Sequence, residues 1–336
     1  MPKQKTSPTS TIPEKSAQSQ IKFGDKSGFH LQMAYASAIL LIVTFVGCKL
    51  KSVQISNPSE IAIALLVALA AVVPLPLYWQ EKGRTDLRDA AMTIPWALLL
   101  AVVLPFSVDV AARLNLPLWD ERFARLDQVL GISVPGITIW ASHNWLGRLA
   151  NRSYPLLIPL LPIAFFGPAL TGKVEHAQGF LISNLTAFAV GVPAFAFFPA
   201  VGPWYGYHFA ARPDQLLCQS QLLALRLPGA YAFQPAGIVC FPSFHVVWAI
   251  LCARALWAFR PLRIPVTVLS GMIILSTMTT GWHYFSDVLA GIAIACLSIA
   301  VAKAIYHHPR RQSMGHPELR CWELRRPVIR ARWLRS

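Results

Sequence analysis

The sequence predicts an all-α fold, a polytopic bundle of about eight transmembrane helices. Its 336 residues are 55% hydrophobic and only 13% charged, whereas charged residues make up about 25% of a soluble domain. Apolar runs near the ~20 residues that cross a bilayer recur along the chain. Much of the formal net charge of +15 lies at the two ends. Together these observations indicate a protein embedded in lipid.

Both ends are predicted to be basic cytoplasmic tails. Residues 1–30 are rich in Lys, Ser, Thr, Gln and Pro, which is typical of a disordered segment and too polar for the start of a signal peptide. Residues 307–336 are rich in arginine. Neither tail has the aromatic interleaving or regular fold of a nucleic-acid module. The charge therefore favours contact with an anionic leaflet and argues against nucleic acid as a partner.

The apolar runs divide the middle of the chain into two regions. Residues 31–178 are expected to form N-terminal transmembrane helices with a long amphipathic outer loop, and residues 179–306 a membrane core that carries the chemistry. Three prolines interrupt the fourth run, which membrane helices tolerate when neighbouring groups satisfy the freed carbonyls. The expected spans are Leu31–Cys48, Ile61–Trp79, Ala90–Ala112, Tyr154–Leu170, Gly179–Ala200, Phe241–Phe259, Ile264–Gly281 and Phe285–Tyr306.

Basic residues in the short loops predict that both termini lie inside the cell, in a bacterial inner membrane. The long outer loops also carry arginines, but the rule is weak for long loops, and three acidic residues, Asp120, Glu121 and Asp127, partly offset them. The predicted inner loops hold Lys82, Arg84, Arg88, Lys173, Arg260 and Arg263.

Two outer loops, roughly 113–153 and 202–240, are long enough to be functional. The first is rich in Trp and Phe, which predicts a helix lying on the membrane surface. Its polar residues His143, Arg148 and Arg152 are expected to face lipid headgroups rather than a pocket.

The six cysteines do not show metal-ligand spacing. Cys48, Cys252 and Cys296 fall inside predicted helices, where a small apolar packing role is expected. Cys218 and Cys240 share one outer loop, and two possibilities stay open for them, a disulfide on an oxidising side or two free thiols.

The first candidate site is Phe241-Pro242-Ser243-Phe244-His245, at the start of the sixth span. Ser243 is suited to be the N-cap of a helix, and a helix N-terminus presents free N–H groups that favour a phosphate. His245 would lie in the first turn and face the same pocket. Alternatively, Ser243 only caps the helix and His245 lies at the water interface.

The second candidate site is His283-Tyr284-Phe285-Ser286-Asp287, at the start of the eighth span. His283 and Asp287 are four residues apart and are therefore expected to share a helical face. Asp287 could accept a proton from one imidazole nitrogen and leave the other free to attack. A purely stabilising His–Asp pair is the alternative. Since one loop and two spans separate the two sites, both helices enter from the same side and the histidines should converge.

These residues resemble the signatures of the type 2 phosphatidic acid phosphatase superfamily. Pro242-Ser243-Phe244-His245 is similar to its PSxH motif, and His283 to Asp287, followed by Val-Leu-Ala-Gly at 288–291, is similar to its HxxxD motif. The resemblance covers about 179–306. It implies that His283 attacks phosphorus and becomes a phosphohistidine, that His245 protonates the leaving group, and that Asp287 orients the nucleophile. It also implies that no metal or cofactor is needed.

Two departures from the superfamily pattern concern basic residues. Thr277 stands where an arginine is usual in the third motif. The first motif is matched only in part, by Arg212-Pro213, and Tyr205 stands in place of its lysine. Arg212 and Ser243 are the candidates for binding the phosphate, although Arg212 could equally be an exposed loop charge. The segment Phe198-Pro199-Ala200-Val201-Gly202-Pro203-Trp204 resembles the FPxxxPW stretch of the inositol phosphorylceramide synthase branch. A proline-rich helix end with an interfacial tryptophan is the alternative explanation.

Three functions follow as expectations. The first is a lipid phosphotransferase of the inositolphosphotransferase type, acting on a lipid phosphate or phospholipid and passing the phosphoryl group to an alcohol such as inositol. The second is a phosphatase for phosphatidate or isoprenyl diphosphate, in which water is the acceptor. The third, of another class, is a transporter or catalytically silent scaffold that uses the ionisable residues as a proton relay.

Overall fold

The computed structural model describes residues 26–53, 72–229 and 237–307, with isolated positions between 59 and 70. These residues form helices joined by turns, without a strand among them, so the predicted all-α fold is confirmed. The predicted tails at 1–30 and 307–336 lie almost entirely outside the described residues.

The N-terminal part of the chain contributes long helices and then a series of short ones. The long helices are α1 (Lys26–Leu50) and α4 (Thr85–Ala112), with the short α3 (Leu75–Glu81) between them. The first outer loop predicted to hold an amphipathic helix is almost wholly helical, in three pieces: α5 (Asp120–Val129), α6 (Val134–His143) and α7 (Trp145–Ser153).

The C-terminal part supplies the remaining helices. Short helical pieces, two of them in the second outer loop, lie between the long helices. In chain order they are η1 (Tyr154–Leu156), α8 (Leu157–Leu170), α9 (Val174–Phe197), α10 (Pro203–Gly206), α11 (Pro213–Arg226), α12 (Phe244–Leu256), η2 (Arg260–Leu262), α13 (Arg263–Thr279) and α14 (Phe285–His307).

Six helical segments of the described chain are long and apolar enough to cross a membrane. Each overlaps one predicted span. The predicted Ile61–Trp79 is described only in part, because several residues between 61 and 71 lie outside the described residues, and its end lies in the short α3. The sixth predicted span differs, because α12 has only 13 residues. Such a helix is about 20 Å long and falls short of a ~30 Å hydrocarbon core. The six segments are Gly28–Leu50, Thr85–Ala112, Trp145–Leu170, Val174–Phe197, Arg260–Thr279 and Phe285–Ile305.

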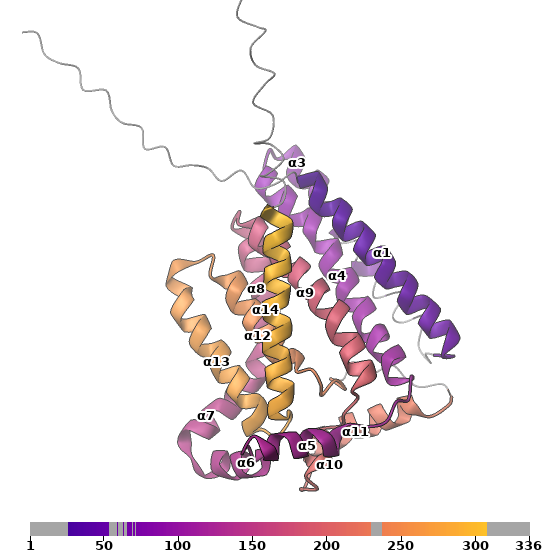
Figure 1. Ribbon diagram of the computed structural model, residues 1–336. Helices are drawn as coiled ribbons and strands as arrows, with labels where there is room; N and C mark the ends of the chain where they lie inside the picture. The colour runs from indigo at the N-terminus through magenta and orange to yellow at the C-terminus, as the bar shows by residue number, and fades with distance from the viewer. Residues whose placement is uncertain are drawn as a thin grey trace, which may run out of the picture.

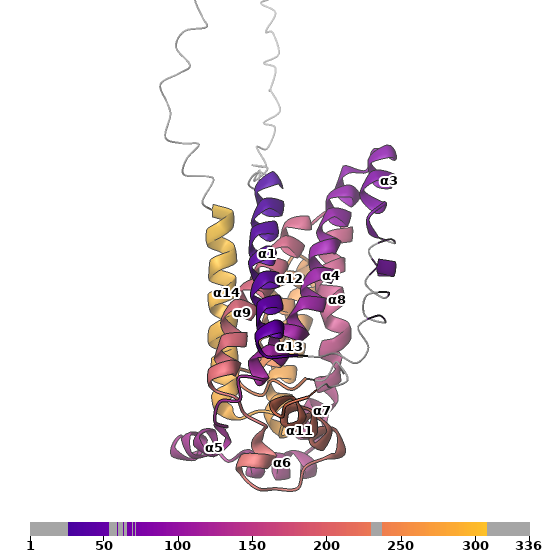
Figure 2. The ribbon, with the colours of Figure 1, turned by 90° about the vertical axis from the view of Figure 1, so that its right-hand side faces the viewer.

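The long helices run side by side and their two ends differ (Figures 1 and 2). The start of α1 and the end of α14 lie at one end of the bundle. At the other end the short helices α5, α6, α10 and α11 lie across the bundle, as both views show. Helices α12 and α14 both begin at this second end (Figure 1). The fold therefore brings the starts of these two helices together, as the predicted topology requires.

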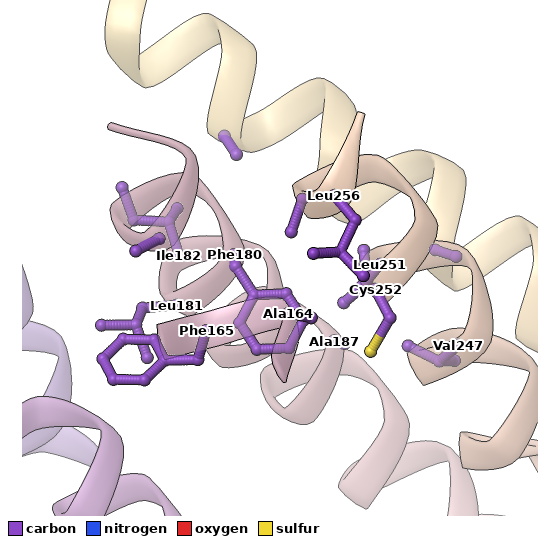
Figure 3. Close-up of a cluster of buried hydrophobic side chains, with 14 of the residues drawn as sticks. Ala164, Phe165, Phe180, Leu181, Ile182, Ala187, Val247, Leu251, Cys252 and Leu256 are labelled. Carbon is purple, nitrogen blue, oxygen red and sulfur yellow. The ribbon is translucent and has the colours of Figure 1, made fainter. Parts of the chain in front are cut away.

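Apolar side chains of α8, α9 and α12 fix the position of α12 in the bundle. Phe165, Phe180 and Leu251 are buried in one cluster, which Figure 3 shows between the three helices. On the outside of the bundle the apolar residues Ile39 and Phe45 of α1 are exposed, as expected for a surface that faces lipid. The buried cluster holds α12 in place although the helix is short.

Candidate active site

His245 and His283 meet at the end of the bundle that the short helices cover. His245 lies in the first turn of α12, and His283 lies in the turn that precedes α14. Their ring centroids are 5.9 Å apart. Both line one cavity of about 560 Å³. The predicted convergence of the two imidazoles is therefore present in the structure.

The start of α12 is fixed by Ser243, which is the N-cap as predicted. Its side chain accepts a hydrogen bond from the N–H of Val246 at 3.4 Å, and its own N–H donates to the carbonyl of Asp287 at 3.2 Å. The side chain is completely buried and does not belong to the described lining of the cavity. The observed contacts of Ser243 thus join the two motifs and start the helix.

A close approach of α14 to this cap involves Gly291, the glycine of the Val-Leu-Ala-Gly sequence. A Cβ atom at this position would lie 2.7 Å from the carbonyl oxygen of Ser243 and 3.0 Å from the Cβ of Val246. A glycine is therefore needed where α14 passes the first turn of α12.

Hydrogen bonds to α13 hold the turn before α14 in place. The carbonyl of Thr277 accepts hydrogen bonds from the N–H groups of Trp282 and His283, at 3.0 and 3.1 Å. Because α14 begins only at Phe285, His283 is outside the helix, whereas the sequence predicted that His283 and Asp287 share a helical face. The two side chains still meet, since the turn folds His283 back to within 3.4 Å of the Asp287 carboxylate.

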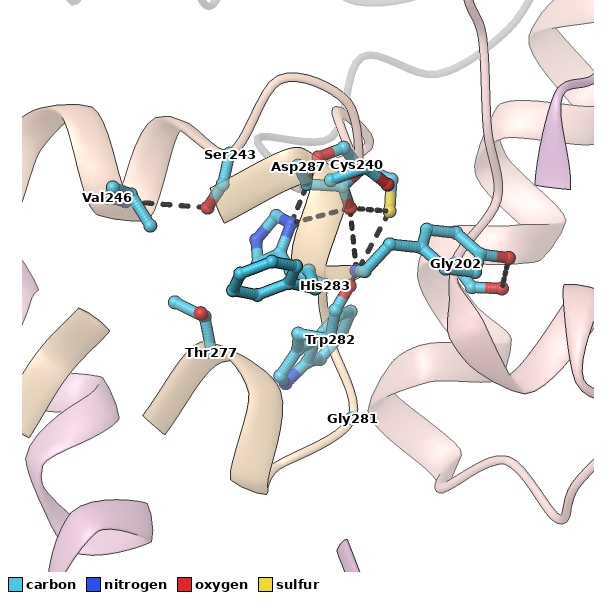
Figure 4. Close-up of polar contacts among 12 residues, drawn as sticks. Gly202, Cys240, Ser243, Val246, Thr277, Gly281, Trp282, His283 and Asp287 are labelled. Atoms are coloured by element: carbon cyan, nitrogen blue, oxygen red, sulfur yellow. Dashed lines mark hydrogen bonds and ion pairs between the residues drawn. The ribbon is translucent and has the colours of Figure 1, made fainter. Parts of the chain in front are cut away.

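The orientation of His283 depends mainly on Cys240. The Nδ1 atom of His283 lies 2.9 Å from the carbonyl oxygen of Cys240 and 3.4 Å from Oδ2 of Asp287 (Figure 4). The same Oδ2 accepts hydrogen bonds from the N–H of Tyr284 at 2.8 Å and from the thiol of Cys240 at 3.1 Å. An Nδ1–H that donates to a carbonyl leaves the lone pair on Nε2. The sequence pattern indicated Asp287 alone for this role, and Cys240 was not anticipated.

Burial determines the charge of His283. It lowers the pKa of this imidazole to about 4, although the hydrogen bond to the Cys240 carbonyl opposes the shift. The ring is therefore neutral near pH 7, and a neutral imidazole with a free Nε2 has the protonation state of a nucleophile.

Aromatic rings flank His245. The ring of Tyr154 stacks on it with a centroid distance of 4.3 Å, and Trp282 lies parallel to Tyr154 at 6.2 Å. Tyr154 comes from the 3-10 turn between α7 and α8. The N-terminal region of the chain, in which the sequence indicated no chemistry, therefore contributes directly to the surroundings of the histidine pair.

Two aspartates of α5 form hydrogen bonds that hold the start of α14 and the turns beside it. The carboxylate of Asp127 accepts hydrogen bonds from the N–H groups of Phe285 at 2.7 Å and Ser286 at 3.1 Å. These are among the first N–H groups of α14, which have no partner inside the helix. Burial raises the pKa of Asp127, and the two N–H donors oppose the shift. Asp127 therefore caps α14 although it belongs to another helix.

Asp120, at the start of the same helix, binds the turn that follows α9. It accepts hydrogen bonds from the N–H groups of Val201 and Gly202, at 3.0 and 2.9 Å, and lies 3.0 Å from the hydroxyl of Tyr284. Gly202 has a φ of +152°, in the region that favours glycine. The sequence treated Asp120 and Asp127 only as charges that offset nearby arginines. Their seven-residue spacing, which places both on one face of a helix, is the signal that could have revealed them.

The segment from Phe198 to Trp204 packs against the same turn. Trp204 is buried and its ring meets that of Trp282 edge-on, with a centroid distance of 5.5 Å. The carbonyl of Gly202 lies 2.8 Å from the Tyr284 hydroxyl. The proline-rich segment is thus a structural support of the residues beside His283.

Arg212 lies near the cavity but not in its described lining. Its side chain is 43% exposed, pairs with Asp214 at 3.2 Å, and places the guanidinium carbon 5.6 Å from the ring centroid of Trp282. The arginine that was predicted to bind phosphate therefore lies at the rim of the cavity. It contacts Trp282, the residue that precedes His283. His143, Arg148 and Arg152 are exposed and lie outside that lining, as expected.

The cavity extends from the histidines into an apolar region between α4 and α8. Leu104, Val108 and Leu161 contribute to this wall. Among the described residues that line the cavity, the acidic side chains are Asp109 and Asp214, and none is a lysine or arginine. The arrangement offers a neutral nucleophile, a second imidazole beside it, and an apolar space for a chain.

Residues 121–301, more than half of the chain, match the family model described as the PAP2 superfamily. The match runs from α5 through most of α14 and so includes both histidines and Asp127. No curated protein and no solved structure matches the chain.

Proposed function

Because the chain belongs to the PAP2 superfamily, whose members are generally phosphatases or phosphotransferases, we propose that it is a membrane lipid phosphotransferase of the inositolphosphotransferase type. In this proposal His283 becomes a phosphohistidine and His245 is the general acid and base. The observation that carries the proposal is the pair of imidazoles 5.9 Å apart in one cavity, with Nδ1 of His283 already hydrogen-bonded.

The first half-reaction transfers the phosphoryl group to the protein. Nε2 of His283 attacks phosphorus, a P–N bond forms, and the P–O bond to the lipid alcohol breaks in line with it. Burial and the neighbouring His283 lower the pKa of His245 to about 3, so the proposal requires His245 to take up a proton when the anionic phosphate binds. His245 then gives this proton to the departing oxygen, so that no free alkoxide forms. The Cys240 carbonyl accepts the hydrogen bond from Nδ1 and stabilises the positive charge that develops on the ring, while Asp287 supplies a nearby negative charge.

The second half-reaction transfers the group to an acceptor. His245, now neutral, removes the proton of an alcohol or a water molecule, and the oxygen attacks phosphorus as the P–N bond breaks. An alcohol as the acceptor gives a transferase. Water gives a phosphatase when the donor is a phosphomonoester, and it releases the phosphorylated headgroup when the donor is a phosphodiester. His245 and His283 return to their initial protonation states in both cases, and the steps proposed for these residues involve no other group.

The charges around the cavity favour the transferase over the phosphatase. A phosphomonoester carries close to two negative charges near pH 7, whereas a phosphodiester carries one. Thr277 replaces the usual arginine, and the described lining holds no lysine or arginine. With Arg212 paired to Asp214 at the rim, a singly charged phosphodiester fits this field better than a dianion. The resemblance of the Phe198–Trp204 segment to the inositol phosphorylceramide synthase branch supports the same choice.

The proposed partners are a phospholipid donor, an alcohol such as inositol or a lipid alcohol as acceptor, and the membrane itself. We also propose that the protein lies in a bacterial inner membrane with both termini in the cytoplasm. The catalytic end of the bundle is opposite the start of α1 and the end of α14 (Figure 1). With both termini in the cytoplasm, the proposal has the histidines at the outer face.

One set of assays tests the proposal and separates it from its two rivals. Purified protein is mixed with phospholipids labelled at phosphorus, quenched, and examined for label on His283. Free phosphate and phosphorylated alcohols are then measured side by side. Label on His283 and transfer to an alcohol are expected, and both should be lost in His283→Ala. Release of phosphate to water alone would indicate the phosphatase. Full turnover by His283→Ala, or no label with any phospholipid, would refute the mechanism.

A further inference from the structure

Three metal-binding side chains meet at the base of the nucleophile. They are Cys240, His283 and Asp287, and the Sγ, Nδ1 and a carboxylate oxygen all lie within 4.8 Å of one another. All three residues are buried, and Cys240 and His283 line the cavity, so a small ion can reach them from it. In the sequence Cys240 is 43 positions from His283 and 47 from Asp287. For this reason the spacing of the cysteines did not indicate a metal site.

Two of the three distances between the ligand atoms are close to those around a tetrahedral ion. Zinc binds a thiolate at about 2.3 Å and imidazole nitrogen or carboxylate oxygen at about 2.0–2.2 Å, so the ligand atoms of a tetrahedral site are roughly 3.3–3.6 Å apart. Sγ of Cys240 lies 3.1 Å from Oδ2 of Asp287, and Nδ1 of His283 lies 3.4 Å from the same oxygen. The two pairs need to move by only a few tenths of an ångström to surround an ion.

We propose that Cys240, His283 and Asp287 form an inhibitory Zn²⁺ site, with a water molecule from the cavity as the fourth ligand. The mixed set of one soft and two borderline or hard donors suits zinc better than magnesium or calcium, which prefer oxygen. The site shares its three residues with the proposed mechanism but uses other atoms, because the bond-making steps are assigned to Nε2 of His283 and to His245.

Inhibition follows from the tautomer of His283, and this part rests on the proposed nucleophile. Zinc takes the lone pair of Nδ1, so the single proton of the neutral ring moves to Nε2 and the attacking atom no longer has a lone pair. The Cys240 thiol loses its proton to solvent when Sγ binds the ion. The hydrogen bond from Nδ1 to the Cys240 carbonyl is also lost.

Cobalt replaces zinc as a spectroscopic probe of the site. Purified full-length protein is titrated with Co²⁺, and a thiolate-to-cobalt charge-transfer band with a 1:1 end point is expected. Cys240→Ser keeps the main-chain carbonyl but removes the soft ligand. It should abolish the band and weaken binding by roughly 100-fold or more, since outer-shell changes alone cost about 10–100-fold. Cys218→Ser is the matched control, because Cys218 lines the same cavity without belonging to the cluster.

Two further measurements complete the test. Zinc inhibition is measured for each variant relative to its own zinc-free rate, and the zinc concentration for half-inhibition should rise with Cys240→Ser but not with Cys218→Ser. In the unaltered protein zinc should protect Cys240, but not Cys218, from alkylation, which needs no variant to fold. Absence of the cobalt band, equal metal affinity of Cys240→Ser, or full activity of the zinc-loaded protein would each overturn the inference. Metal binding without any phosphohistidine would instead contradict the proposed function and, with it, the inhibitory role.

Discussion

The carboxylate of Asp127 accepts a hydrogen bond of 2.7 Å from the backbone N–H of Phe285. One residue belongs to α5 and the other is the first residue of α14, so a helix lying across the end of the bundle caps a helix that runs through it. Phe285 is two residues from His283. The position of His283 therefore depends on a helix that carries neither histidine.

Removing this cap should lower both stability and rate. Asp127→Ala leaves the N–H groups of Phe285 and Ser286 buried without an acceptor, which should cost about 1–2 kcal/mol by analogy with other lost N-caps. Asp127→Asn keeps one oxygen and should lose less. Turnover should fall further than stability alone explains, because the turn that carries His283 shifts. Unfolding in detergent and turnover at a temperature where the variants are folded are the measurements.

A control for these variants exists on the same helix. Glu121 is exposed and pairs only with Arg125 on the surface, at 3.3 Å, and such pairs contribute little. Glu121→Ala should therefore leave stability and rate nearly unchanged. If Asp127→Ala behaves like Glu121→Ala, α5 does not position the turn.

Asp287→Asn should slow phosphorylation of His283 without unfolding the protein. The Asp287 carboxylate faces the Nδ1 side of the imidazole, but the shorter contact of Nδ1 is with the Cys240 carbonyl. The variant therefore keeps the tautomer and loses the negative charge that stabilises the charged ring after attack. We expect a rate loss on the order of 10²-fold, within the usual range for acid–base groups, and rapid-quench labelling of His283 measures it. A variant with no labelled protein at all would show that Asp287, rather than the carbonyl, fixes the tautomer.

The buried, neutral His283 should make stability depend on pH. Burial lowers its pKa to about 4, whereas an unfolded histidine titrates near 6.5. Between these values the unfolded chain binds more protons, so stability rises with pH. The contribution is complete above about pH 6.5, is lost as the pH falls toward 4, and amounts to roughly 3 kcal/mol for the full shift. Denaturation midpoints from pH 4 to 7 should therefore change less in His283→Gln, and equal slopes in both proteins would exclude the lowered pKa.

Much of the fold and part of the site could be predicted from the sequence because their signals are local. Runs of apolar residues identify spans without any tertiary information, and Ser243 is recognisable as a cap from the residues around it. The two histidines could be paired because the topology of the last spans returns the chain to the same end. These inferences use one helix or one connection at a time.

The remaining parts of the site depend on contacts between distant segments, which leave no local pattern. Asp127 caps a helix more than 150 residues away, and in sequence it resembles any acidic residue of an amphipathic helix. Cys240 contacts His283 through its main-chain carbonyl, which every residue type has. The residue type at position 240 therefore gives no signal of this contact. The short length of α12 was missed for a related reason. Apolar residues beyond the two ends of this helix lengthen the apolar run in the sequence without lengthening the helix.

Gly291 allows a final test of the contact between the two histidine helices. Gly291→Ala would place a Cβ atom 2.7 Å from the Ser243 carbonyl oxygen, so α12 and α14 must separate. Overpacking of this kind costs about 1–3 kcal/mol, and separation should also increase the distance between His245 and His283 and lower the rate of phosphorylation. Gly271 of α13 is the matched control, because no atom lies within 4 Å of a Cβ added there, and Gly271→Ala should be neutral or stabilising by up to about 1 kcal/mol. Detergent unfolding and single-turnover labelling of both variants make the comparison. If Gly291→Ala retained the stability and rate of Gly271→Ala, the spacing of the two helices would not control the geometry of the histidine pair.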